Sequence, residues 1–97
     1  MKALFIAYNE ALHEEVIEQL KLTMLKGYTA WHSITGAGSR SGDPHLGSHA
    51  WPTMNSAILV FAEDDKAKEL KRRVELVDIE NPSLGLRVFS WKIDEES

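Results

Sequence analysis

The sequence predicts a single α+β domain with the ferredoxin-like order β-α-β-β-α-β, in which two helices cover one face of a four-stranded antiparallel sheet. Three observations support this prediction. Four short apolar stretches alternate with two amphipathic stretches of helical repeat. A long segment rich in glycine and proline separates the second and third apolar stretches. The chain of 97 residues has room for one small core, so residues 1–97 form one domain.

The first half of the chain reads as strand, helix and strand. Residues 3–8 are apolar on both alternating faces, as in a strand covered on two sides. Asn9 is expected to cap the first helix and Gly27 to follow its end. The apolar stripe of this helix is Leu12, Val16, Leu20 and Met24. Residues 28–35 alternate as a second strand. One face of that strand is expected to carry Tyr28, Ala30, His32 and Ile34.

The second half repeats the order of strand, helix and strand. Residues 54–62 form the strongest predicted strand, again apolar on both faces. Asp64 or Asp65 can cap the second helix, and Asn81-Pro82 ends it. Its apolar stripe is Ala67, Leu70, Val74 and Val77. Residues 86–93 form the last strand.

The apolar character of both strand faces predicts self-association. Two helices cover only one face of such a sheet, and an exposed apolar sheet would be an aggregation hazard. We therefore expect the uncovered faces of several copies to meet in a symmetric homo-oligomer. Trp31 and Trp91 are expected to lie on this shared face.

Composition excludes several classes of function. The net charge of −4 and a pI near 5.5 disfavour nucleic-acid binding, which needs a basic surface. The sequence has no cysteine, which suits a cytoplasmic protein without disulfides. The N-terminal apolar run is too short for a signal peptide or a membrane insertion. No arrangement of a nucleophile, base and acid points to an enzyme.

The segment from Gly36 to Pro52 organises the chain. It holds four of the six glycines, two of the three prolines and two of the four histidines. Glycines at 36, 38 and 42 allow close backbone approach to a ligand, or serve only to turn a long hairpin. A connection of this length between strands is commonly functional. We expect it to be a projecting recognition loop.

The histidines and a cationic cluster each allow a functional and a simpler interpretation. His45 and His49 could bind a divalent metal ion, with His32 as a third ligand, although a solvated loop is the simpler interpretation. His13 is expected to be solvated on the polar side of the first helix. Cationic side chains of the second helix alternate with Glu69 and Glu75, as on a solvated face with i,i+4 pairs. These cationic residues are Lys66, Lys68, Lys71, Arg72 and Arg73.

Two stretches resemble the PII signal-transduction family. They are ITGAGSRSG at residues 34–42 and AILVFAEDD at residues 57–65. PII proteins carry Gly-x-Gly followed by Arg and Gly at the base of a loop called the T-loop, and then a hydrophobic strand that ends in an acidic pair. The sequence DIENPSLG at 78–85 differs from the basic, glycine-rich segment of the nitrogen-regulatory members. The chain is therefore similar to divergent PII-like proteins.

The resemblance implies a homotrimer that binds a small anionic effector, such as ATP or ADP, at clefts between subunits. The residues that it assigns to the ligand are Gly36, Gly38, Arg40 and Gly42, and backbone N–H groups and the guanidinium suit phosphate oxygens. The loop then signals to a target protein through Asp43, Leu46 and Trp51. The alternative is a metal-binding trimer similar to the copper-tolerance CutA family or to PII-like proteins of metal efflux, with His45 and His49 as ligands.

Overall fold

The protein is represented by a computed structural model that describes residues 1–35, 37–38, 43–44 and 54–94. In chain order its elements are β1 (Lys2–Asn9), the 3₁₀ turn η1 (Glu10–Leu12), α1 (His13–Leu22), β2 (Thr29–Ile34), β3 (Ala37–Gly38), β4 (Asp43–Pro44), β5 (Asn55–Ala62), α2 (Asp64–Glu80) and β6 (Leu86–Lys92).

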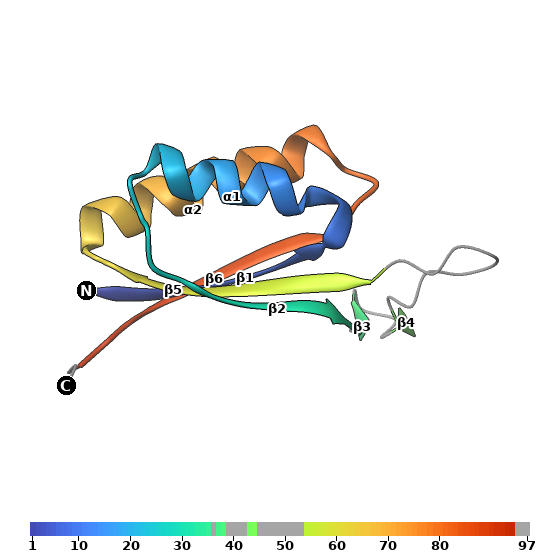
Figure 1. The fold of residues 1–97 in the computed structure, drawn as a ribbon, viewed down its shortest axis with the longest axis horizontal. Helices are drawn as coiled ribbons and strands as arrows, with labels where there is room; N and C mark the ends of the chain where they lie inside the picture. The colour runs from blue at the N-terminus through green and yellow to red at the C-terminus, as the bar shows by residue number, and fades with distance from the viewer. Residues whose placement is uncertain (36, 39–42, 45–53, 95–97) are drawn as a thin grey trace.

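The main sheet has four antiparallel strands in the order β2-β5-β1-β6. Both helices lie on one side of this sheet, and no described element covers the other side (Figure 1). This is the ferredoxin-like α+β arrangement, so the fold class predicted from the sequence is confirmed. β3 and β4 form a separate two-stranded ribbon, which the sequence analysis did not predict.

The core lies between the sheet and the helices. Opposite residues of β1 and β5 share a face, and the pairs Leu4 with Val60 and Ile6 with Ile58 are completely buried. The helices bury the residues expected of their stripes. These are Leu12, Val16 and Leu20 before and within α1, and Ala67, Leu70, Val74 and Val77 in α2. Burial of these side chains supplies most of the driving force for folding.

The helical segment begins after Asn9, as predicted from the sequence. The Asn9 side chain accepts a hydrogen bond of 2.9 Å from the Ala11 N–H, which satisfies a backbone donor at the helix start. The chain first makes the 3₁₀ turn and then enters α1. Asn9 itself is held by a bond of 2.8 Å from its N–H to the Gly85 carbonyl, which fixes this corner to the beginning of β6.

The end of α1 differs from the expectation. The helix stops at Leu22, well before Gly27, and Met24 has a positive φ of 62° and is 72% exposed. The Leu25 N–H reaches the Leu20 carbonyl and the Met24 N–H reaches that of Lys21, both at 2.9 Å. This is a Schellman motif with methionine in the position that glycine usually occupies. Met24 was therefore wrongly placed in the apolar stripe.

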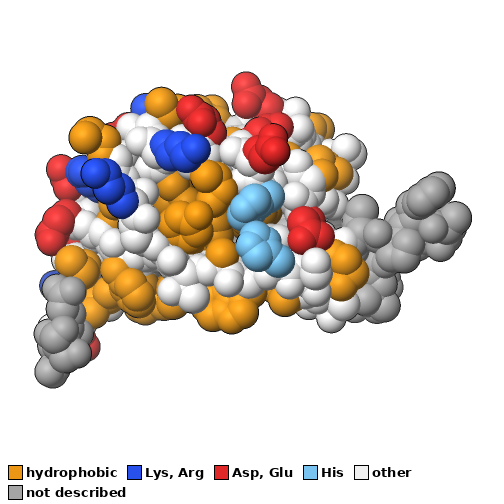
Figure 2. Space-filling model, viewed as in Figure 1, with side chains coloured by type: hydrophobic (Ala, Val, Ile, Leu, Met, Phe, Trp, Pro, Cys, Tyr) orange, Lys and Arg blue, Asp and Glu red, His pale blue; other side chains and the backbone are white. Residues whose placement is uncertain are grey.

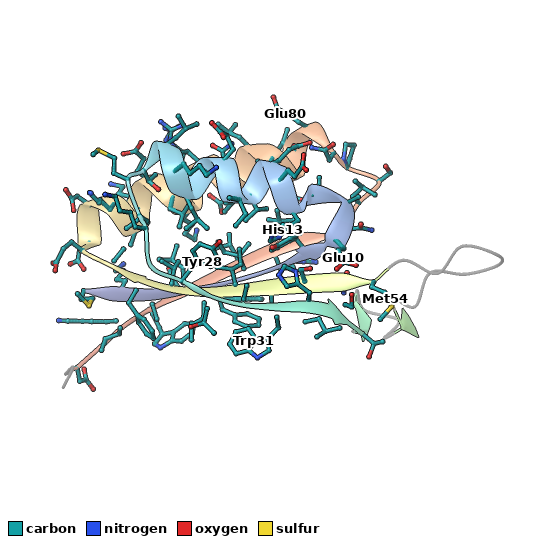
Figure 3. All side chains as sticks on the ribbon, in the orientation of Figure 1. Glu10, His13, Tyr28, Trp31, Met54 and Glu80 are labelled. Carbon is teal, nitrogen blue, oxygen red and sulfur yellow. The ribbon has the colours of Figure 1, made fainter. Side chains whose placement is uncertain are left out.

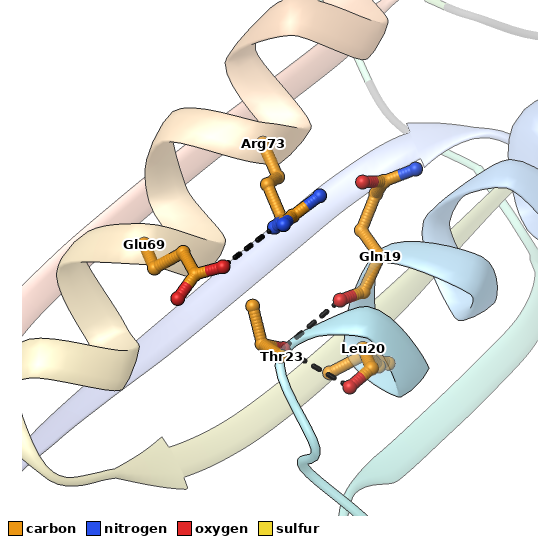
Figure 4. A network of polar contacts seen from close by, with 5 residues as sticks. All are labelled: Gln19, Leu20, Thr23, Glu69 and Arg73. Carbon is orange, nitrogen blue, oxygen red and sulfur yellow. Dashed lines mark hydrogen bonds and ion pairs between the residues drawn. The ribbon is translucent and has the colours of Figure 1, made fainter.

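Thr23 strengthens this helix end. Its hydroxyl donates to the carbonyls of Gln19 and Leu20 at 2.9 and 3.0 Å (Figure 4). The same two carbonyls accept from the Thr23 and Leu25 N–H groups, so the hydroxyl adds a second hydrogen bond to each of them.

A bulge changes the register of β2. Trp31 lies opposite Ala57 and Ile34 opposite Asn55, with an irregularity between them at Ser33, where φ is 55°. The extra residue moves Ile34 to the same face as Trp31, because directly opposite residues of paired strands point to the same side. The expected alternation, with Ile34 on the Ala30 face, is wrong beyond this point.

The second helix begins one residue earlier than expected. Glu63 is its N-cap and makes no side-chain cap bond, while Asp64 and Asp65 lie in the first turn. The N-terminal amine lies 3.1 Å from the Asp64 carboxylate and lowers the pKa of that carboxyl. Asn81 ends the helix as expected.

No helix in the described part of the chain has the length and apolar composition needed to cross a membrane.

The cationic face of α2 forms the expected i,i+4 pairs. Lys71 lies 3.1 Å from the Glu75 carboxylate, and Arg73 lies 2.9 Å from that of Glu69 (Figure 4). These pairs are solvent-exposed and contribute little stability each.

The Schellman motif leads to a first prediction. Met24→Gly should raise the free energy of unfolding by about 0.5 to 1 kcal/mol, because glycine adopts a positive φ without the steric cost that methionine bears. The matched control is Met24→Ala, which removes the same exposed side chain but keeps the strained backbone. Urea denaturation of the three proteins measures the difference. A glycine variant no more stable than the alanine variant would contradict the assignment.

Candidate functional site

The uncovered face of the sheet is strongly apolar. Phe5 lies opposite Leu59 on one side and Phe89 on the other, all on the face that points away from the helices. The large side chains on this face remain open to solvent in the single chain. They include Trp31, Phe61, Phe89 and Trp91, which are 45%, 52%, 58% and 49% exposed. Figure 3 shows Trp31 projecting on the side of the sheet opposite the helices.

Such a surface is unusual for a monomer. Contiguous apolar patches of this kind mark contact sites with other molecules. Trp31 and Trp91 lie on the face where the sequence analysis expected them, at positions on the two edge strands β2 and β6. The uncovered sheet face, defined here as Phe5, Trp31, Leu59, Phe61, Phe89 and Trp91, is the first part of the candidate site.

The second part is the backbone where the segment 36–53 leaves the sheet. At the β2 bulge, the Ser33 hydroxyl donates a hydrogen bond of 3.1 Å to the Glu10 carboxylate. Glu10 belongs to η1, and its N–H in turn donates to the Met54 carbonyl at 2.9 Å. Both ends of the segment are therefore tied to the same turn, one through Ser33 and one through Met54.

The small ribbon adds a third constraint on this segment. Gly38 pairs with Asp43 and Ala37 pairs with Pro44. Gly38 and Asp43, which flank residues 39–42 in the sequence, are consequently held next to each other. Of the candidate ligand and partner residues, the structure thus places Gly38 and Asp43 and brings them together as backbone partners.

The other candidates from the sequence lie outside the described residues. This holds for the ligand candidates Gly36, Arg40 and Gly42, for the metal candidates His45 and His49, and for the partner candidates Leu46 and Trp51. Their assignment stays a prediction. Within the described part of the chain, no group of three or more His, Asp or Glu side chains has the arrangement of a metal site.

A cluster that the sequence analysis missed lies beside η1. The Tyr8 hydroxyl and the His13 Nδ1 are 2.6 Å apart, and the two rings are stacked with centroids 5.9 Å apart. His32, from β2, meets His13 edge-on with ring centroids 4.8 Å apart. His13 is therefore half-buried and hydrogen-bonded, and the expectation that it is merely solvated is wrong.

The environment of Tyr8 keeps its hydroxyl protonated. Burial raises the pKa of Tyr8 to about 12, helped by Tyr28 and Glu10. Tyr8 is only 1% exposed. Near neutral pH the phenol can thus either donate to His13 or accept from it, whichever tautomer the imidazole adopts.

An apolar groove lies at the other end of α1. It has a volume of about 420 Å³. Its lining residues are Ile17, Leu20, Lys21, Met24, Leu25, Lys26 and Tyr28.

Comparison with known proteins supports the fold assignment. No family model matches the sequence, and no curated protein matches it significantly. Solved structures do match. CPII from Thiomonas intermedia K12, bound to ADP and bicarbonate, superposes with a TM-score of 0.68 at 20% identity, over 97% of this chain and 88% of that chain. A second CPII structure, bound to ADP, AMP and bicarbonate, gives 0.66 at 19% identity over 99% and 94%.

A PII-like signalling protein from Thermus thermophilus also matches. Its TM-score is 0.65 at 19% identity, over 93% of this chain and 83% of that chain. Identities this low establish the shared fold. The resemblance to PII-like proteins predicted from the sequence is confirmed at this level, over almost the whole chain.

The buried phenol leads to a second prediction. Since the pKa of Tyr8 is raised to about 12 in the folded protein and is about 10 when unfolded, only the unfolded state loses this proton as the pH rises from 10 to 12. The free energy of unfolding should therefore fall by about 2 kcal/mol over this range, relative to Tyr8→Phe. Chemical denaturation at several pH values measures it. Parallel curves for wild type and Tyr8→Phe would refute the assignment.

Proposed function

We propose that this protein is a PII-like regulatory protein, a homotrimer that binds a small anionic effector at clefts between subunits and reports its presence to a target protein. The observation that carries the proposal is the match over 97% of the chain to a PII-like protein bound to ADP and bicarbonate. The absence of cysteine from the sequence is consistent with a cytoplasmic protein. The described matches are regulatory or signalling proteins, which favours regulation over catalysis.

The uncovered sheet face supports the oligomeric part of the proposal. In a single chain the aromatic side chains of this face remain exposed to water, which is unfavourable in free energy. Burial against other copies of the chain would remove this unfavourable exposure. A closed ring of subunits also creates clefts at the edges of each sheet. The segment 36–53 begins at the edge strand β2, so in such a ring it leaves the sheet near a subunit boundary.

The ligand part rests on the glycines and the arginine of this segment. Glycines at 36, 38 and 42 have no side chain that would block the approach of an anion to backbone N–H groups, and Arg40 would add charge-assisted hydrogen bonds. The segment DIENPSLG at 78–85, which runs from the last turn of α2 to the start of β6, has no basic residue. Phosphate recognition in this chain is therefore assigned to the loop base, and ATP or ADP is the preferred candidate effector.

The signalling part follows from the anchoring of the loop. Glu10 ties both ends of the segment to η1 through Ser33 and Met54. A ligand at the loop base would act on backbone next to these anchors and could change the order of the remaining loop. Asp43, Leu46 and Trp51 are the residues proposed to contact the target protein.

A thermal-shift experiment tests effector binding. ADP, ATP and AMP, each with and without bicarbonate, are added to wild type and Arg40→Ala. A ligand at 100 times its Kd stabilises the native state by about 2.7 kcal/mol, which is a clear shift for a domain of this size. The shift should vanish in Arg40→Ala and persist in the control Arg72→Ala, on the exposed face of α2. No shift with any nucleotide would exclude the proposed effector class.

A second experiment tests the subunit contact. Phe89→Glu places a charge on the uncovered sheet face and should convert the oligomer to monomers, because burying an unpaired carboxylate is strongly unfavourable. Ile79→Glu is the matched control, since Ile79 is equally apolar and 70% exposed but lies on α2. Light scattering after size-exclusion chromatography gives the masses. Equal masses for both variants would argue against this face as the contact.

A further inference from the structure

Two histidines that lie far apart in the sequence meet at the surface. His13 is the first residue of α1 and His32 lies in the edge strand β2. Their ring centroids are 4.8 Å apart and their planes are inclined by 73°. In Figure 2 they form one continuous histidine surface, the only one on this view of the described residues. Both imidazoles are thus open to a small ion from solvent.

The spacing of the rings fits a shared metal ion. Two imidazoles that bind one ion at the usual nitrogen–metal distance of about 2.1 Å have centroids roughly 4.5 to 5.3 Å apart, for coordination angles of about 90° to 110°. The observed separation of 4.8 Å falls within this range. The inclination of the planes is no obstacle, because coordination of one ion by two imidazoles sets no condition on the angle between their ring planes.

The hydrogen bond of His13 leaves one ring nitrogen available. Its Nδ1 is engaged by the Tyr8 hydroxyl at 2.6 Å, so Nε2 is the nitrogen that can bind an ion. If it does so, Nδ1 carries the proton and donates it to the phenol oxygen. Metal-binding histidines are usually oriented by such a bond from their second nitrogen. Tyr8 is buried in the hydrophobic core, which makes it an effective positioning residue.

The surrounding charge favours a cation. Figure 2 shows an acidic side chain next to the histidine pair, whereas the Lys and Arg side chains on this view lie beyond a hydrophobic area. Glu10 precedes His13 by three residues and is held by Ser33, the neighbour of His32. Its carboxylate adds negative charge at the same corner of the fold (Figure 3).

We propose that His13 and His32 together chelate a divalent first-row transition metal ion, such as Zn²⁺ or Cu²⁺, through one nitrogen of each ring. Imidazole is a preferred ligand for these ions. No third protein ligand completes the site among the described residues, so water or another small ligand fills the remaining positions. This site differs from the loop histidines His45 and His49 and does not depend on the proposed effector.

Isothermal titration calorimetry with ZnCl₂ tests the proposal on the full chain. Wild type should bind one ion per chain. His13→Gln and His32→Gln should each lower the affinity by at least about tenfold, since each leaves a single imidazole. The double variant His45→Gln/His49→Gln is the matched control and should bind as the wild type does.

The variants also separate a lost ligand from a lost fold. His13→Gln removes a partner of the buried Tyr8, so its circular dichroism and melting temperature are measured without metal. His32→Gln alters an exposed residue of an edge strand and keeps the test valid if His13→Gln unfolds. Unchanged affinity in a folded His32→Gln variant would overturn the proposal. So would the loss of binding in the loop double variant alone, which would assign the metal to His45 and His49.

Discussion

The structure depends on the coverage of a four-stranded sheet by only two helices. The strands alternate their side chains, so the register that buries Leu4 and Ile6 against Val60 and Ile58 also directs Phe5, Leu59 and Phe89 to the opposite side. The chain has no third layer among its described elements to cover them (Figure 1). One register therefore builds the core of a subunit and, at the same time, the surface through which subunits are proposed to assemble.

Much of this fold could be predicted from the sequence because the apolar periods are clear. The α2 stripe of Ala67, Leu70, Val74 and Val77 is buried in full. The predictions fail where the backbone departs from regular helix or strand geometry, because the repeat of apolar residues then no longer determines which face a side chain occupies. Met24 continues the four-residue repeat of α1, but a Schellman motif ends that helix first. Ile34 continues the alternation of β2, but the bulge at Ser33 reverses its face. Neither Met24 nor Ser33 is of a residue type that favours a positive φ, so neither event was signalled.

The candidate site could be predicted only in part. Glycine and proline density located the segment 36–52, and Gly38 and Asp43 are paired at its base. The histidine pair was missed because it depends on tertiary packing: His13 follows Tyr8 across the turn η1, and His32 reaches it from a strand that is distant in sequence. Glu10 connects the base of the segment with the histidine pair. Its carboxylate accepts from Ser33 at the β2 bulge, its N–H donates to the Met54 carbonyl just before β5, and its charge helps to raise the pKa of Tyr8.

The central claim is that the apolar side of the sheet is buried by other copies of the chain, and sedimentation equilibrium of the wild-type protein tests it most directly. The account predicts one species at micromolar concentration with three times the mass of the 10.9 kDa chain. A stable species with the mass of a single chain would contradict it, because the proposed clefts between subunits would then not exist.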